Sequence, residues 1–212
     1  MKIALVAPTG KIGSEIAKEA LRQGHHIVGI VRSARVAPEG MGSIDFKVLN
    51  IGDTAAFADA IKGVDVLASA YGAHGDQIES VVGAAKSIIA AARAANIKRV
   101  IVVGGAGSLE IAPGSFLVDA PTFPPAYKPY AVAHDKAFQF FKSANDLDWT
   151  FFSPAAEIGP GEKIGNYKVA EKILQKNANG VSKISYADYA EAFVAEISRG
   201  EYIKNIMTVA YK

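Results

Sequence analysis

The chain lacks cysteine altogether, and this absence excludes three kinds of chemistry. Without thiols there are no disulfides, no thiolate metal sites and no cysteine nucleophiles. The histidines do not replace them, because His25 and His26 are adjacent and show no metal-ligand spacing with other groups. We therefore expect no metal site and a structural role for both histidines.

A long hydrophobic run and an excess of charge of one sign are also lacking. The apolar segment IALVA near the first residue is too short for the core of a signal peptide, and no stretch has the length of a transmembrane helix. Lysines and arginines are scattered, and the net charge is only +2. We expect a cytoplasmic protein that binds neither a membrane nor nucleic acid.

The 212 residues alternate short β-branched runs with longer helical patterns. Strands are predicted at residues 2–7, 25–31, 45–51, 64–72, 98–105, 148–154 and 205–210, and helices at 12–21, 53–63, 77–95, 131–143 and 186–198. This alternation predicts an α/β fold, namely a Rossmann-like, doubly wound, mostly parallel sheet. We expect a single domain over residues 1–212 with a small C-terminal substrate lobe.

Two segments that follow strands are too long to be plain connections. Residues 105–130 are rich in proline, glycine and aromatic side chains, and residues 155–170 are rich in glycine. Long irregular loops in a compact domain usually act as lids or binding walls. Because ligands of such sheets lie beyond the carboxyl ends of the strands, both segments are predicted to face an acceptor molecule.

The heptapeptide APTGKIG lies between the first strand and the first helix. Gly10 and Gly13 stand where a dinucleotide-binding turn needs close approach of the backbone to a pyrophosphate and of the helix to the strand. The helix N-terminus would supply unpaired N–H groups and a partial positive charge. Ala7 replaces the glycine of the tight turn, which costs little if that turn needs no positive φ.

The second strand ends in IVRSAR, without the acidic residue that binds the ribose 2′-hydroxyl of NAD. Arg32 stands at that position with Ser33 beside it, about twenty residues after the glycines. A guanidinium matches phosphate geometry, so Arg32 predicts a preference for NADPH over NADH.

Taken together, several stretches resemble a known group: the Gly turn, VR after the second strand, AYG, VVGGAGSL, DWTFFSPAAEIGPGEKIGNY, ISYADYAEAFVAEI and MTVAYK. The chain resembles the atypical short-chain dehydrogenase/reductases, and within them the NAD(P)H-flavin reductases related to the biliverdin reductase B type. The resemblance covers essentially the whole chain. It implies an NADP(H) cofactor, with NAD(H) as an alternative, and a flavin such as FMN or FAD as the acceptor.

The resemblance also assigns residues to parts of the dinucleotide. The pyrophosphate turn would comprise Ala7, Thr9, Gly10, Lys11, Ile12 and Gly13, and the adenosine side Arg32, Ser33, Asn50 and Ile51. Ala70, Tyr71 and Gly72 would lie along the nicotinamide ribose, and Ser153 and Pro154 near the nicotinamide. Asn50 departs from the aspartate usual in the group, although its side-chain oxygen can still accept a bond from the adenine amino group.

The Tyr-x-x-x-Lys pair of ordinary short-chain dehydrogenases is missing. Tyr130 and Lys136 are six residues apart, a spacing that does not place them on one helix face. This weakens the case for alcohol or ketone chemistry and favours a flavin, which takes hydride directly while solvent supplies the proton. If a side chain assists, the candidates are Ser108, Tyr130 and Lys136, together with His134, for which a packing role is the better interpretation.

Two functions therefore remain open. The chain is either an NADPH-dependent reductase of a free flavin or quinone-like acceptor, or a regulator that binds NADP without turnover. A methyltransferase also uses a Gly turn, but it would want an acidic residue where Arg32 stands. The expected partner is a small-molecule acceptor, and the protein is expected to be a monomer or a homodimer.

Overall fold

The computed structural model describes residues 1–34, 39–73, 75 and 77–212. Its main sheet has eight strands: β1 (Lys2–Val6), β2 (His26–Val31), β3 (Asp45–Val48), β4 (Val66–Ser69), β5 (Arg99–Val103), β8 (Asp148–Ser153), β10 (Tyr167–Glu171) and β12 (Asn205–Tyr211). Five helices accompany it: α1 (Lys11–Arg22), α2 (Thr54–Ala60), α3 (Ser80–Ala94), α4 (Lys128–Ser143) and α5 (Tyr186–Arg199). Two small two-stranded sheets pair β6 (Glu110–Ala112) with β7 (Ser115–Phe116) and β9 (Glu157–Gly159) with β11 (Lys183–Ser185).

The strands of the main sheet follow the order β3-β2-β1-β4-β5-β8-β12-β10. Seven of them are parallel, and β10 alone runs antiparallel, on β12. The chain winds outward from β1 through β2 to β3, and then in the other direction from β4. The order therefore reverses between β1 and β4, the place where such sheets bind their ligand. The predicted doubly wound α/β fold is confirmed.

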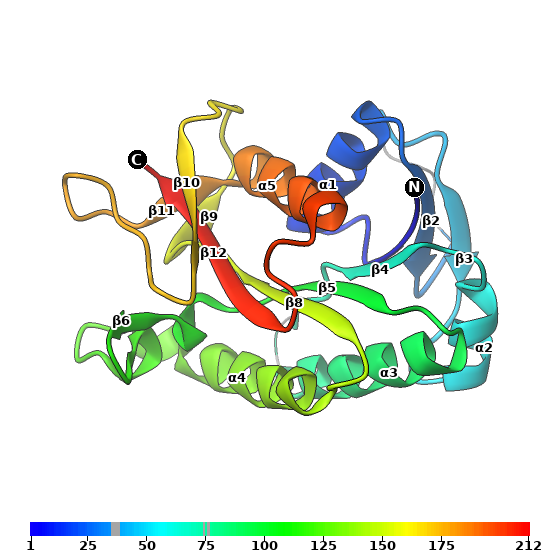
Figure 1. The fold of residues 1–212 in the computed structure, drawn as a ribbon, viewed down its shortest axis with the longest axis horizontal. Coiled ribbons are helices and arrows are strands. Elements are labelled where there is room, and N and C mark those ends of the chain that lie inside the picture. The colour runs from blue at the N-terminus through cyan, green and yellow to red at the C-terminus, as the bar shows by residue number, and fades with distance from the viewer. Residues whose placement is uncertain (35–38, 74, 76) are drawn as a thin grey trace.

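Helices cover both faces of the sheet and create two apolar cores (Figure 1). On one face α1 packs beside α5, and on the other α2, α3 and α4 lie in a row. The central strands are buried on both faces, which explains why β1 reads as a continuous apolar run. Among the described residues, no helix combines the length and apolar character that crossing a bilayer would need.

Side-chain caps begin two of the helices, and two segments outside the predicted elements have regular structure. Asp53 caps α2 by accepting a bond from the Ala56 N–H (3.0 Å), and the Ser185 hydroxyl caps α5 by accepting one from the Asp188 N–H (3.0 Å). The predicted loop at residues 105–130 contains the β6–β7 hairpin and three short 3₁₀ turns, at Ala106–Ser108, Leu117–Asp119 and Pro125–Tyr127. The strand β10 was not expected, although the alternation in YKVAE is typical of a half-exposed edge strand.

Candidate functional site

A pocket of about 270 Å³ opens where the strand order reverses. It is lined by Val6, Ala7, Thr9, Gly10, Ile30, Val31, Arg32, Ser33, Leu49, Ile51, Ala70, Tyr71, Gly72, Gln77 and Ser80. These residues come from the carboxyl ends of β1 and β2, from the segments that follow β1, β2, β3 and β4, and from the start of α3. Nine of the residues predicted to hold a dinucleotide thus meet in one place.

The turn after β1 is tighter than the sequence suggested. Ala7 has φ 58°, in the left-handed region, where a non-glycine residue is strained by about 1–2 kcal/mol. Its carbonyl oxygen accepts a bond from the Gly10 N–H (3.2 Å), and a Cβ on Gly13 would collide with the same oxygen. Gly13 is therefore needed for the approach of helix to strand, as predicted. The turn does need a positive φ at Ala7, so the condition under which this alanine would cost little is not met.

The first turn of α1 presents unpaired backbone donors to the pocket side. The first bond within the helix runs from the Ser14 N–H to the Gly10 carbonyl (2.8 Å), so the N–H groups of Lys11, Ile12 and Gly13 have no acceptor within the helix. Gly10 is the N-cap and lines the pocket, and no side chain caps this end, whereas Lys11, Ile12 and Gly13 are not among the lining residues. An anion at this helix end would meet free N–H groups and the positive end of the helix dipole.

Arg32 and Ser33 follow β2 and form an exposed rim of the pocket. Among the described residues that line the pocket, none is acidic, and Arg32 is the only basic one. The rim therefore offers a cation for an additional phosphate and no carboxylate for a pair of ribose hydroxyls.

The adenosine and ribose walls come from the segments after β3 and β4. Ile51, Ala70, Tyr71 and Gly72 line the pocket. Asn50 is exposed beside it, and its Oδ1 already accepts a bond from the Gly52 N–H (3.0 Å). An adenine amino group would have to share that oxygen, which leaves the predicted role of Asn50 less supported than that of Ile51.

Sequence reasoning missed several lining residues. Leu49 and Gln77 belong to connections and Ser80 is the first residue of α3, and no local pattern distinguishes them. Val6, Ile30 and Val31 are strand residues whose ends form the floor. The rule that ligands lie at the carboxyl ends of strands could have found these three.

Ser153 and Pro154 do not line this pocket. Both are buried at the end of β8, and the Ser153 hydroxyl donates a bond to the Gly105 carbonyl (2.9 Å). That bond joins the end of β8 to the connection after β5. The connection also packs closely there, because a Cβ on Gly104 would collide with the Phe151 ring and fall 2.9 Å from the Ser153 hydroxyl oxygen. Their predicted place beside the nicotinamide stays a prediction.

Two of the candidate catalytic groups are buried without a partner. The Ser108 hydroxyl and the Nδ1 atom of His134 have no hydrogen-bond partner among the described residues. Burial lowers the pKa of His134 to about 4, so its imidazole is neutral near pH 7. His134 packs against Gly105 and lines a small cavity together with Ser69 and Tyr71, which agrees with the packing role preferred from the sequence.

Tyr130 and Lys136 both extend from α4 toward the segment after β4. The Tyr130 hydroxyl donates to the Gly75 carbonyl (3.4 Å), and the Lys136 ammonium donates to Glu79 Oε1 (2.8 Å). Lys136 is therefore paired with a carboxylate rather than with a tyrosine, and the two side chains do not form a dyad.

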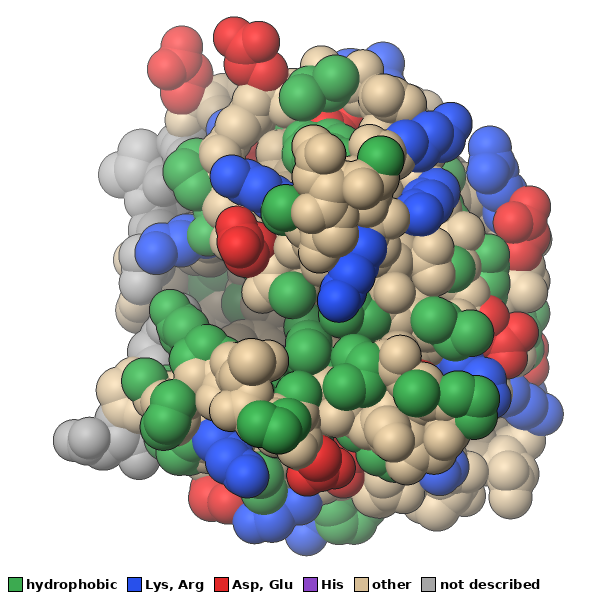
Figure 2. Space-filling model, turned by 90° about the vertical axis from the view of Figure 1, so that its left-hand side faces the viewer, with side chains coloured by type: hydrophobic (Ala, Val, Ile, Leu, Met, Phe, Trp, Pro, Cys, Tyr) green, Lys and Arg blue, Asp and Glu red, His purple; other side chains and the backbone are tan. Residues whose placement is uncertain are grey.

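The side of the molecule that carries β6 and the β10–β11 connection shows hydrophobic side chains gathered in its lower half (Figure 2). The segment 105–130 exposes Ile111, Phe116 and Tyr127, by 43%, 40% and 65% respectively. An apolar surface suits a flat aromatic molecule better than a compact charged one.

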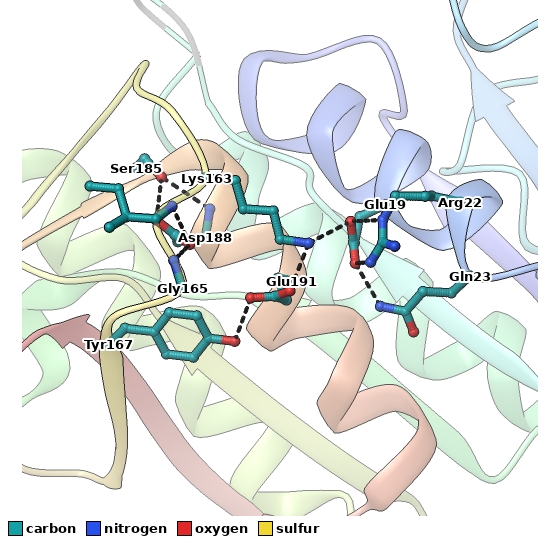
Figure 3. Close-up of polar contacts among 10 residues, drawn as sticks. Glu19, Arg22, Gln23, Lys163, Gly165, Tyr167, Ser185, Asp188 and Glu191 are labelled. Carbon is teal, nitrogen blue, oxygen red and sulfur yellow. Dashed lines mark hydrogen bonds and ion pairs between the residues drawn. The ribbon is translucent and has the colours of Figure 1, made fainter.

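The second predicted acceptor loop, residues 155–170, is fixed to the scaffold by buried charge (Figure 3). The fully buried Asp188 accepts bonds from the N–H groups of Ile164 (3.0 Å) and Gly165 (2.8 Å). Burial raises the pKa of Asp188, but the bonds from Ile164, Tyr211 and Gly165 outweigh it and hold that pKa below its ordinary value.

The same loop carries Lys163, which pairs with Glu19 of α1 (3.1 Å) and Glu191 of α5 (2.6 Å). The hydrogen bond from Arg22, followed by those from Gln23 and Lys163, lowers the pKa of Glu19 to about 2 against the effect of burial. The cation of Lys163 is thus neutralised within the protein.

Comparison with known proteins gives consistent relatives. Residues 8–199 match a protein family described as NAD(P)H-binding. The "uncharacterized protein YwnB" of Bacillus subtilis (strain 168) is 36% identical over 213 residues, which cover 99% of this chain and 98% of YwnB.

Two similar crystal structures span both chains completely. A "putative exported protein" from Burkholderia pseudomallei is 46% identical with a TM-score of 0.93, and a "putative NADH-flavin reductase" from Streptococcus pneumoniae TIGR4 is 34% identical with a TM-score of 0.90. The name of the first leaves the cytoplasmic location of this chain a prediction.

These matches confirm the resemblance that the motifs indicated. The family match begins within the Gly turn, directly after β1, and ends at the last residue of α5, so it includes the Gly turn from Pro8 onward and the ends of β2, β3 and β4. This chain belongs to the NAD(P)H-binding family and has its Rossmann fold.

Proposed function

We propose that this protein is an NADPH-dependent oxidoreductase that transfers hydride to a free flavin or a quinone-like acceptor. The observation that carries the proposal is the pocket between β1 and β4. The pocket is lined by Gly10, the N-cap of α1, next to the free N–H groups of that helix, and its rim holds Arg32 and, among its described residues, no carboxylate. Family membership supports the nicotinamide cofactor, and the rim supports the choice of NADPH.

The bound dinucleotide would supply the hydride, and the residues of this chain would bind and orient it. The N–H groups of Lys11, Ile12 and Gly13 would hold the pyrophosphate, and Arg32 and Ser33 the 2′-phosphate. Correct placement of two reacting rings is itself a large part of catalysis in hydride transfer. The chain needs no general acid if solvent provides the proton.

Two features support an acceptor that reacts through a flat aromatic ring. The surface of residues 105–130 exposes apolar side chains, and Lys163 of the other loop is already neutralised by Glu19 and Glu191. Lys163 is therefore not available to clamp an acidic substrate. The name of the reductase from Streptococcus pneumoniae favours a flavin among such acceptors.

The coenzyme preference is tested with Arg32→Ala. A charge-assisted hydrogen bond contributes roughly 1.5–3 kcal/mol, so the variant should lose about one to two decades of NADPH affinity while NADH affinity changes little. Titration calorimetry with both coenzymes measures the ratio. As a control, Lys11→Ala should affect both coenzymes alike, since the pyrophosphate is common to them. An unchanged ratio in Arg32→Ala would refute the assignment.

The reaction is tested by following the loss of NADPH absorbance with FMN, FAD, riboflavin and a panel of quinones. Turnover with a flavin or quinone is the expected result. NADPH binding without oxidation by any of these acceptors would instead identify a nucleotide-sensing regulator. This second candidate is favoured by the contacts of two candidate catalytic side chains, because Tyr130 is bonded to Gly75 and Lys136 to Glu79 rather than free to act on an acceptor.

A further inference from the structure

The start of α3 and the residues just before it form one wall of the dinucleotide pocket. Gln77 and Ser80 line it, and the Ser80 hydroxyl donates to the Gln77 carbonyl (2.6 Å). Between them in sequence stands Glu79, the N-cap of α3, whose side chain makes no cap bond to the helix. The position of this turn therefore decides how well the wall fits a bound dinucleotide.

The carboxylate of Glu79 instead connects the start of α3 to α4. It accepts a bond from the Lys136 ammonium of α4 at 2.8 Å, with the two side chains 67% and 53% exposed. A second contact from α4 lies close by, because the Tyr130 hydroxyl reaches the Gly75 carbonyl. Both contacts connect α4 to the chain that enters α3.

We propose that Lys136 is a positioning residue that holds the first turn of α3 at the dinucleotide pocket through Glu79. The inference rests on the proposed function, and it assigns to Lys136 a role in coenzyme affinity rather than in proton transfer. A lysine that is paired with a carboxylate at this wall acts on the coenzyme through Gln77 and Ser80. The pair is exposed, so its effect is modest and depends on salt.

The same two helices supply a matched control at their other end. Arg93, in the last turn of α3, pairs with Asp146, just after α4, at 2.7 Å, and the two side chains are 49% and 48% exposed. Arg93 lies 13 residues after Ser80, which is about 20 Å along the helix. Removing either cation deletes one exposed ion pair and changes the net charge equally, but only Lys136 is near the pocket.

The experiment measures NADPH affinity by fluorescence titration and steady-state kinetics for the wild type, Lys136→Met, Glu79→Gln, Arg93→Met and the double exchange Glu79→Lys with Lys136→Glu. Lys136→Met and Glu79→Gln should each raise the Kd and KM for NADPH about two- to five-fold, with kcat unchanged. The double exchange should recover most of the affinity, and Arg93→Met should leave it unaltered. Near 1 M salt, where charges are screened within about 3 Å, the difference between wild type and Lys136→Met should shrink.

Four results would overturn the inference. A loss of kcat with unchanged Kd in Lys136→Met would indicate a catalytic role. Opposite changes of the NADPH Kd in Lys136→Met and Glu79→Gln would show that these side chains act only through their charge near the phosphates of the coenzyme. Failure of the double exchange to recover affinity, or an equal effect of Arg93→Met, would remove the positioning role. If the wild type itself binds no NADPH, the proposed function fails first, and that outcome is distinct from these four.

Discussion

At the scale of single residues, Ala7 shows most clearly where sequence and structure differ. Its backbone is in the left-handed region at the edge of the pocket, although the residue carries a methyl group. Gly13 packs directly against the Ala7 carbonyl and holds this turn in place. Strained residues of this kind persist where the surrounding structure fixes them, and they cluster at binding sites. The strain at Ala7 therefore agrees with a turn shaped for a ligand.

Ala7→Gly should stabilise the protein. Glycine removes a strain of about 1–2 kcal/mol but increases the freedom of the unfolded chain, which leaves a gain of about 0.5–1 kcal/mol. For a protein of this size the midpoint of thermal unfolding should rise by about 1–4 °C. Calorimetry checks this, with Ala4→Gly in the buried strand β1 as a control that should lower the midpoint. A lower midpoint for Ala7→Gly would show that the turn is not strained.

At the scale of elements, a single buried carboxylate fixes the 155–170 loop to α5. Asp188, in the first turn of α5, has no solvent exposure and binds two backbone N–H groups of the 155–170 loop. It also accepts bonds from the hydroxyls of Ser185 (3.1 Å) and Tyr211 (2.7 Å). One carboxylate thus joins the loop, the start of α5 and the end of β12.

Asp188→Asn should destabilise this junction. An amide replaces one acceptor oxygen with a donor, so at least one buried donor loses its partner, at a cost of about 2–3 kcal/mol. Urea unfolding should show the loss, and limited proteolysis should cut within the loop sooner. Glu191→Gln, which affects a partly exposed carboxylate on the same helix, should cost less than about 1 kcal/mol. Equal stability of wild type and Asp188→Asn would contradict the anchoring role.

The elements themselves were largely predictable, and their partners were not. Alternating β-branched and helical runs are local patterns, so the seven parallel strands and five helices could be predicted. The edge strand β10 is short and half-exposed, and it is recognisable only when β12 lies beside it. In the candidate site, Gly10, Gly13 and Arg32 follow from their position after strands. Gln77 and Ser80 line the pocket only because α3 packs there.

At the scale of the whole molecule, stability depends on pH through groups in different parts of the fold. Burial lowers the pKa of His134 to about 4, and the Arg22 and Arg93 hydrogen bonds lower those of Glu19 and Asp146 to about 2. Each group binds protons more readily in the unfolded chain. Protonation therefore favours unfolding in every case.

The free energy of unfolding should fall in two stages as the pH is lowered. Between pH 6.5 and about 4 the loss comes from His134 with a contribution from His25, and between about 4.5 and 2 it comes from Glu19 and Asp146 with a contribution from Asp188. Urea unfolding at a series of pH values measures both stages. His134→Leu should flatten the upper stage and Glu19→Gln the lower one. An upper stage of the same size in His134→Leu would show that another group is responsible.

The sequence by itself determined the succession of strands and helices along the chain, the glycine turn and the basic residue after β2. These depend on residues close in sequence and on the rule that parallel strands end at one edge. Only the tertiary structure decided that Ala7 is strained, that Ser153 is hidden and that Lys136 meets Glu79. The last pair is 57 residues apart in sequence, and such partners are set by how α3 and α4 pack rather than by any local pattern.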